Sequence, residues 1–288
     1  MKKIKTENVK EINEFIDTVS KDKTIDLSNF YKNLETLNFY RLSSDELNEI
    51  TGGSGDAAYE YRRNEIYASQ KSYKVRSIYH ELFHMASTKK EKNIIYNGYL
   101  IEDIDNNMYR GRGINEGYTE LLCERYFDTA TNYDFERILV KQLEQIVGND
   151  ILKNNYFNPN LDALINELSK YSSIEETEKF ISSFDTYNYY MSLSNEGTKE
   201  TVQEALDNCC SYIFYTYLNK LKINESNDID ELLLNFINEF TFQAISKDDN
   251  NYGWISIGDS IKKIGESSGM FNVTLDEEQN NEKTINRN

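Results

Sequence analysis

The 288-residue chain contains only one proline, two histidines and three cysteines. Because proline interrupts helices, its near absence permits long continuous helices. The cysteines, Cys123, Cys209 and Cys210, fit a reducing compartment better than a disulfide framework. Apolar runs such as those at 212–214 and 232–234 are far too short to span a bilayer, which argues against a membrane-spanning helix.

Positive charge is also scarce, with 32 Lys and Arg against 49 Asp and Glu and a net charge of −17 at pH 7. No cluster of basic residues is interleaved with aromatic residues, so nucleic-acid binding is disfavoured. The basic start at 1–5 is followed by charged residues such as Glu7 and Glu11 in place of the apolar stretch of a signal peptide. We therefore expect a cytoplasmic protein without nucleic-acid or membrane partners.

Both histidines fall in one motif, His80-Glu81-Leu82-Phe83-His84. Two histidines four positions apart on a helix lie about 40° apart around its axis, so both can reach one metal ion. Glu81 lies about 60° from His84, where it can address a metal-bound water without being a ligand. The motif predicts one zinc ion per chain with Glu81 as general base. The alternative is a chance motif on a surface helix, or two core histidines with hydrogen-bond partners.

The residues around this motif have the pattern of an amphipathic helix packed on a core beside a cleft. The histidines flank the apolar stripe rather than lie in it. The stripe consists of Val75, Ile78, Tyr79, Leu82, Phe83 and Ala86.

A catalytic zinc ion keeps three protein ligands and one position for water, so a third ligand is needed. In segment 111–122 an apolar stripe of helical spacing runs from Ile114 to Leu122, and Glu116 and Glu120 share another face. Such an acidic pair is usually solvated. Here two histidines and a metal ion would neutralise it, which makes burial tolerable. We predict Glu116 as the ligand and Glu120 as the acceptor for the outer N–H of a liganding histidine.

At these residues the chain resembles the gluzincin class of zinc metallopeptidases, which includes thermolysin and the aminopeptidase-N-like enzymes. The resemblance rests on 80–84 followed by Asn-Glu-Gly-Tyr-Thr-Glu at 115–120. It implies that His80, His84 and Glu116 are the zinc ligands and that Glu81 is the base. It also implies that Glu120 supports His80, and that Asn115 lies behind the ligands in an outer layer.

The resemblance covers about residues 40–125 and stops at the level of the class. The interval from His84 to Glu116 holds 31 residues, more than in either named subfamily. The downstream histidine of thermolysin-like enzymes and the exopeptidase motif of aminopeptidase-N-like enzymes are both absent. The group that would stabilise the oxyanion is therefore unknown, although a tyrosine or an arginine is required. The helical part offers Tyr187, Tyr189, Tyr190, Tyr212, Tyr215 and Tyr217 as candidates.

Before the histidine motif, segments 57–61 and 65–69 flank Arg62-Arg63-Asn64. This pattern predicts a β-hairpin. Segment 37–42 predicts a further strand, and 94–101 a second hairpin. In gluzincins a sheet edge beside the zinc helix binds peptide by strand addition. We assign that edge to Glu65, Ile66, Tyr67 and Ala68; the alternative is an ordinary structural strand.

The expected fold class is α+β, predominantly helical and zincin-like. A small mixed α/β lobe with β-hairpins and the active-site helix spans 1–113, and a helical lobe that supplies the third ligand spans 114–275, followed by a disordered tail at 276–288. The helices are expected at 9–19, 133–147, 161–171, 174–184, 199–222 and 229–245, in addition to those of the two motifs.

The sequence thus predicts a zinc metallopeptidase that hydrolyses peptide bonds of a peptide or protein substrate. A zinc-activated water would attack with Glu81 as general base. The alternative is a catalytically weak, zincin-like binding or regulatory protein with an intact zinc site. A purely structural zinc site is a third possibility, in which Cys123 would be the fourth ligand and chelation would unfold the protein.

Overall fold

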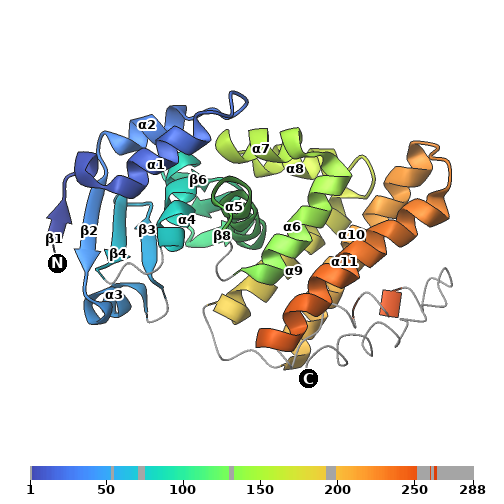
Figure 1. Ribbon diagram of the computed structural model, residues 1–288. Coiled ribbons are helices and arrows are strands. Elements are labelled where there is room, and N and C mark those ends of the chain that lie inside the picture. Colours follow the sequence, from blue (N-terminus) through green and yellow to red (C-terminus); the bar gives the residue numbers. More distant parts are fainter. Residues whose placement is uncertain are drawn as a thin grey trace, which may run out of the picture.

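The structure is a computed structural model that describes residues 2–52, 55–70, 75–129, 133–192, 199–251, 260, 263 and 264. All strands described lie in the first 110 residues, and the described chain beyond them is helical (Figure 1). The first part contains β1 (Lys2–Ile4), a 3₁₀ turn (Thr6–Asn8), α1 (Lys10–Val19), α2 (Ser28–Leu34), β2 (Asn38–Leu42), α3 (Ser44–Thr51), β3 (Ala57–Glu60), β4 (Glu65–Ser69) and α4 (Val75–Ala86).

These strands form a four-stranded sheet in the order β1-β2-β4-β3, in which β2 and β4 are parallel and the other pairs antiparallel. The predicted hairpin is therefore confirmed as β3 and β4. The assignment of Glu65–Ala68 as a peptide-binding edge is wrong, because β4 lies inside the sheet with its backbone paired to β2 on one side and β3 on the other. In the described sheet the edge beside α4 is β3.

A second sheet connects α4 to the next long helix. It is an antiparallel meander of β5 (Thr88–Glu91), β6 (Ile94–Asn97), β7 (Leu100–Asp103) and β8 (Met108–Arg110). The hairpin expected at 94–101 is confirmed as β6 and β7. The meander occupies most of the interval between His84 and Glu116, so the extra length of that interval is an ordered sheet.

The remaining helices follow in sequence. They are α5 (Arg112–Phe127), α6 (Asp134–Val147), α7 (Asn149–Phe157), α8 (Leu161–Leu168), α9 (Ile174–Ser192), α10 (Lys199–Ile223) and α11 (Ile229–Asn251). The helices expected from periodicity are confirmed, although α8 is three residues shorter than expected, and α9 and α11 extend eight and six residues further. Three short helices, α2, α3 and α7, were not predicted. The segment 276–288 lies outside the described residues.

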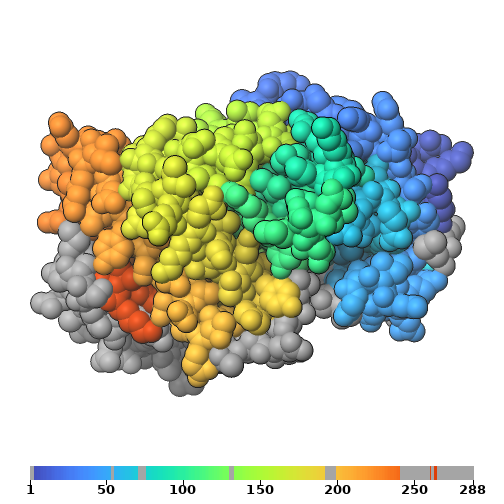
Figure 2. All heavy atoms as spheres, turned by 180° about the vertical axis from the view of Figure 1, so that it is seen from behind, coloured from blue at the N-terminus to red at the C-terminus, as the bar shows by residue number. Residues whose placement is uncertain are grey.

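One hydrophobic core runs through both parts of the chain, and α5 is at its centre. This helix packs against α4, α6, α9 and β7. Gly117 permits the close approach of α6, since a Cβ there would lie 2.4 Å from the backbone oxygen of Glu136. Figure 2 shows the resulting broad contact between the green β5–β8 region and the yellow-green to yellow helices α7 to α9.

The described protein is thus α+β and mostly helical, as expected. Among the described helices, none combines the length and apolar character that crossing a membrane would require.

Candidate metal centre

Helix α4 carries both histidines beside its core-packed face. Its buried apolar face includes Ile78, Tyr79, Leu82, Phe83, Met85 and Ala86, and the helix packs on β3, α1, α2 and α5. The helix is therefore held on several sides by apolar contacts. His80 and His84 lie at the edge of this face and are only 5% and 7% exposed, so both rings are fixed by packing.

Helix α5 supplies the carboxylates. Residues 113–123 are all buried, including Glu116 and Glu120. The helix begins after Gly111, whose φ of 80° favours glycine. Asp185 of α9 accepts hydrogen bonds from the backbone N–H groups of Gly111 (2.7 Å) and Gly113 (2.8 Å). An acceptor from a distant helix therefore caps α5 and sets its position.

Three ligand atoms converge between the two helices. Nε2 of His80 and Nε2 of His84 are 2.9 Å apart. Oε2 of Glu116 lies 3.1 Å from the first and 3.3 Å from the second. The structure thus brings together the three residues expected to bind zinc.

The outer nitrogen of His80 faces a buried carboxylate. Nδ1 of His80 lies 2.9 Å from Oε2 of Glu120, which is fully buried. An ionised carboxylate only accepts hydrogen bonds, so the Nδ1 atom carries the proton. This places Glu120 in its expected role and leaves the lone pair of His80 on Nε2.

The outer nitrogen of His84 is fixed by a chain of amides. The backbone N–H of Tyr99 can only donate, and it is 3.1 Å from Oδ1 of Asn115. The amide nitrogen of Asn115 therefore faces Oδ1 of Asn97, at 3.1 Å. That oxygen also accepts from Nδ1 of His84 at 3.0 Å, so the lone pair of His84 is likewise on Nε2. Asn115 lies behind the ligands as expected, but Asn97 on β6 was not predicted.

The donor chemistry fits a zinc ion. Both Nε2 atoms and the Glu116 oxygen are hydrogen-bond acceptors, so at these separations they repel one another unless a proton or a cation lies between them. Ligands about 2.0–2.1 Å from a tetrahedral zinc ion lie roughly 3.3 Å apart. The separations of 2.9, 3.1 and 3.3 Å are close to this value. His80, His84 and Glu116 would hold the ion.

The titration of these groups reflects the same arrangement. Burial alone would lower the pKa of His80, but hydrogen bonds with Cys123, Glu116 and Glu120 raise it well above its usual value. Burial likewise opposes ionisation of Glu116, yet the two histidines hold its pKa well below the usual range. Without metal, the site therefore retains a proton. Since metal binding must displace that proton, metal affinity decreases in acid.

A second set of donors shares His80. The atoms that His80, Glu120 and Cys123 offer also lie within 4.8 Å of one another. Burial raises the pKa of Cys123 to about 11, so its thiol remains protonated at neutral pH. A metal ion here would also displace the hydrogen bond between His80 and Glu120. The set of His80, His84 and Glu116 is therefore the better zinc site.

Glu81 lies beside the ligands and is held by a hydrogen bond from the first sheet. Its Oε2 accepts the backbone N–H of Tyr59 at 2.9 Å, on the side of β3 that faces away from β4. Burial raises the pKa of Glu81, while His80 and His84 oppose that increase. Among the described residues its Oε1 has no hydrogen-bond partner, so this oxygen is available to exchange a proton.

Two further polar side chains, Tyr133 and Arg112, border the ligands. The ring of Tyr133, at the start of α6, stacks on His80 with centroids 5.5 Å apart and an angle of 22°. The negative charge of Glu116 and burial raise the pKa of Tyr133, so its hydroxyl remains a hydrogen-bond donor. Nε of Arg112 lies 4.0 Å from Oε1 of Glu116.

The six tyrosines named from the sequence pack elsewhere. Tyr187 packs on Phe135, Tyr212 stacks on Phe180, and Tyr217 stacks on Phe236, whereas Tyr189, Tyr190 and Tyr215 are at least partly exposed. Tyr133, six residues beyond the end of α5, could only be connected to the site through the fold, because no sequence pattern distinguishes it among 22 tyrosines.

No family model, curated protein or solved structure matches this chain. The geometry of the chain itself therefore carries the functional argument.

The amide chain behind His84 can be tested by substitution of Asn97. Asn97→Leu removes the acceptor for Nδ1 of His84, so zinc affinity should decrease about 10- to 100-fold. Asn97→Asp keeps an acceptor at that position and should hold affinity within a few-fold. Competition with a chromogenic chelator measures both. Asn93→Leu, an exposed position next to the same strand, is the control. Equal affinities for Asn97→Leu and wild type would contradict the assigned role.

Glu136 provides a second test because it is a buried carboxyl close to the same charges. It is 4% exposed, accepts from Nδ2 of Asn188 at 2.9 Å, and its pKa is raised to about 7 by burial. Since this pKa exceeds that of the unfolded chain, stability is present at low pH and is lost as the pH rises from about 4.5 to 7. The loss is on the order of 3 kcal/mol.

Glu136→Gln keeps an acceptor for Asn188 but cannot ionise. With metal chelated, its gain in free energy of unfolding over wild type should therefore be larger at pH 8 than at pH 5.5. Urea titrations at the two pH values measure the difference. Glu231→Gln, at an exposed position on α11, should show no such change between them. A constant difference for Glu136→Gln would show that Glu136 ionises normally.

Proposed function

We propose that this chain is a zinc-dependent metallopeptidase of the gluzincin type, with a zincin-like active site. The observation that carries the proposal is the convergence of two imidazole lone pairs and one carboxylate oxygen next to the free oxygen of Glu81. A set of three protein ligands that leaves a position open is typical of catalytic rather than structural zinc.

When bound, zinc polarises a substrate carbonyl and lowers the pKa of a water molecule. The chain's own residues supply the proton transfers. Oε2 of Glu81 is anchored by the N–H of Tyr59, which leaves Oε1 for the proton transfers. Oε1 accepts a proton from the attacking water and then delivers it to the leaving amine. The raised pKa of Glu81 suits both steps, because it brings the acid and base forms closer in energy.

The substrate backbone has a place on β3. This strand is the edge of the described sheet beside α4, and its residue Tyr59 already directs its N–H toward Glu81. A peptide added in extended form along β3 would carry its backbone past Glu81. The edge assigned from the sequence was the neighbouring strand of the same hairpin.

Tyr133 is the proposed oxyanion stabiliser. It stacks on His80, interacts electrostatically with Glu116, and keeps its proton. A hydroxyl donor near developing negative charge is worth about 100- to 1000-fold in rate. In this role it would replace the downstream histidine of thermolysin-like enzymes, which this chain lacks.

The decisive experiment compares metal content and peptide hydrolysis in two variants. Glu81→Gln should retain one zinc per chain and lose at least about 100-fold in turnover, because the proton acceptor is gone. Glu116→Ala should lose the zinc. Mass spectrometry of metals and a quenched-fluorescence peptide library give the two readouts, with Glu91→Gln on β5 as control. Stoichiometric zinc without turnover in wild type would favour a binding or regulatory protein.

Tyr133→Phe tests the stabiliser. It should retain zinc and lose about 100-fold or more in kcat, since the stacked ring remains and only the donor is removed. Tyr126→Phe removes a hydroxyl that bonds to Asp22 at 2.6 Å and should leave kcat unchanged. Steady-state kinetics on one cleaved peptide provide the comparison. A kcat close to wild type in Tyr133→Phe would assign the role to another group.

A further inference from the structure

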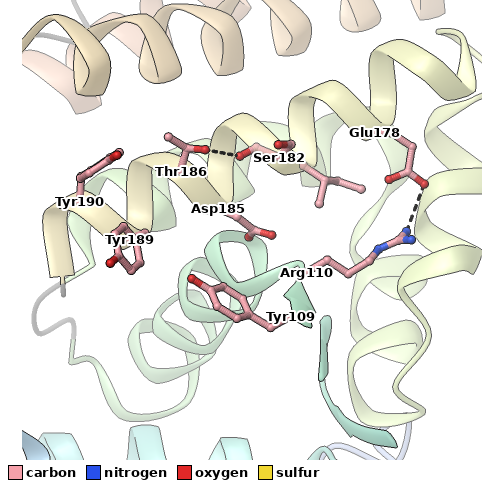
Figure 3. A pocket seen from close by; sticks show the side chains of 9 residues that line it. Tyr109, Arg110, Glu178, Ser182, Asp185, Thr186, Tyr189 and Tyr190 are labelled. Carbon is pink, nitrogen blue, oxygen red and sulfur yellow. Dashed lines mark hydrogen bonds and ion pairs between the residues drawn. The ribbon is translucent and has the colours of Figure 1, made fainter. Parts of the chain in front are cut away.

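A pocket of about 410 Å³ opens between β8, the start of α5 and α9. Figure 3 shows Asp185 directed from α9 toward the start of α5, with Tyr109 below it and Tyr189 further along α9. The side chains of Tyr109 and Tyr189 are 45% and 40% exposed, so their rings are accessible to a ligand. The pocket therefore combines aromatic surface with carboxylates.

The charge of this pocket is negative. Arg110, one of its lining residues, pairs with Glu178 at 3.2 Å and with Asp162, which lies outside the lining, at 3.4 Å. Asp185 adds a third carboxylate, which accepts hydrogen bonds from the backbone N–H groups of Gly111 and Gly113 and interacts electrostatically with Arg112. Three carboxylates thus face the two guanidinium groups of Arg110 and Arg112, which leaves an excess of one negative charge, and the chain as a whole carries −17. Both the local and the long-range field favour a cationic ligand.

The pocket adjoins the candidate metal centre. The guanidinium of Arg112 interacts electrostatically with Glu116 and Tyr133 at the metal centre and also with Tyr109 in the pocket. Along α5, the segment 111–113 precedes Glu116 by three to five residues, or about 5–8 Å. An extended peptide advances about 3.3 Å per residue, so the pocket is within about three residues of the reacting bond.

We propose that this pocket binds a lysine or arginine side chain of the peptide substrate, an inference that rests on the proposed peptidase function. Tyrosine rings attract the cation through their faces, and this attraction adds to that of the carboxylates. Apolar ring surface also covers the methylene stem of such a side chain. The substrate class is therefore basic peptides, with the basic residue close to the scissile bond.

A binding experiment tests the pocket without turnover. Two blocked peptides, acetyl-Ala-Arg-Ala-amide and its citrulline counterpart, differ only in charge and are titrated by calorimetry into the metal-free full chain. Wild type should bind the arginine peptide at least threefold more tightly. Tyr189→Leu and Glu178→Gln should each reduce this preference at least twofold. Tyr215→Leu, with a tyrosine 44% exposed on α10, and Glu239→Gln, with a carboxylate 45% exposed, should not.

Equal binding of the two peptides by wild type would overturn the proposal, as would a preference that survives in both pocket variants. Cleavage-site mapping with the zinc-loaded chain on a peptide library separates this outcome from failure of the peptidase proposal. Cleavage without basic preference, together with equal binding, rejects the pocket and leaves the peptidase. A binding preference for arginine without any cleavage supports the pocket and rejects the peptidase.

Discussion

The mutual approach of three hydrogen-bond acceptors is the constraint on which the site depends. Two imidazole nitrogens and a carboxylate oxygen lie about 3 Å apart in a buried position. Such a group is unfavourable unless positive charge lies between its members. Because both outer ring nitrogens are held as donors, by Glu120 and by Asn97, the rings cannot relieve the repulsion by changing tautomer. A retained proton or a bound metal ion would resolve the conflict.

The two helices that carry the site, α4 and α5, are held in place by separate sets of contacts. Apolar contacts with the first sheet and with α1 and α2 fix α4. The start of α5 is capped by Asp185, and Gly117 lets α6 pack directly on α5. The β5–β8 meander joins the two helices and also carries Asn97, which binds His84. The meander therefore acts both as a connection and as part of the outer layer of the site.

Local patterns in the sequence were sufficient for the centre of the site and for the long helices. The spacing of His80, His84, Glu116 and Glu120 follows from helix geometry, so the structure brings these four residues together as expected. Strand order depends instead on long-range pairing. Alternation identified both strands of the hairpin, but it could not show that β2 pairs with β4 and leaves β3 at the edge.

The outer groups were missed for the same physical reason. Asn97 and Tyr133 have no shared spacing with the histidine motif, and each reaches the site through a different element. The helices α2, α3 and α7 are seven to nine residues long. Segments of that length give only about two turns of periodicity, and their stability comes from packing.

X-ray absorption at the zinc edge of the purified, zinc-loaded chain tests the central claim most directly. If His80, His84 and Glu116 bind the ion, its nearest neighbours should all be nitrogen or oxygen atoms, at about 2.0–2.1 Å from the zinc. That spectrum should lose its imidazole signal in part when His84 is replaced by alanine. A sulfur scatterer at about 2.3 Å would place the ion with Cys123 instead and contradict the account.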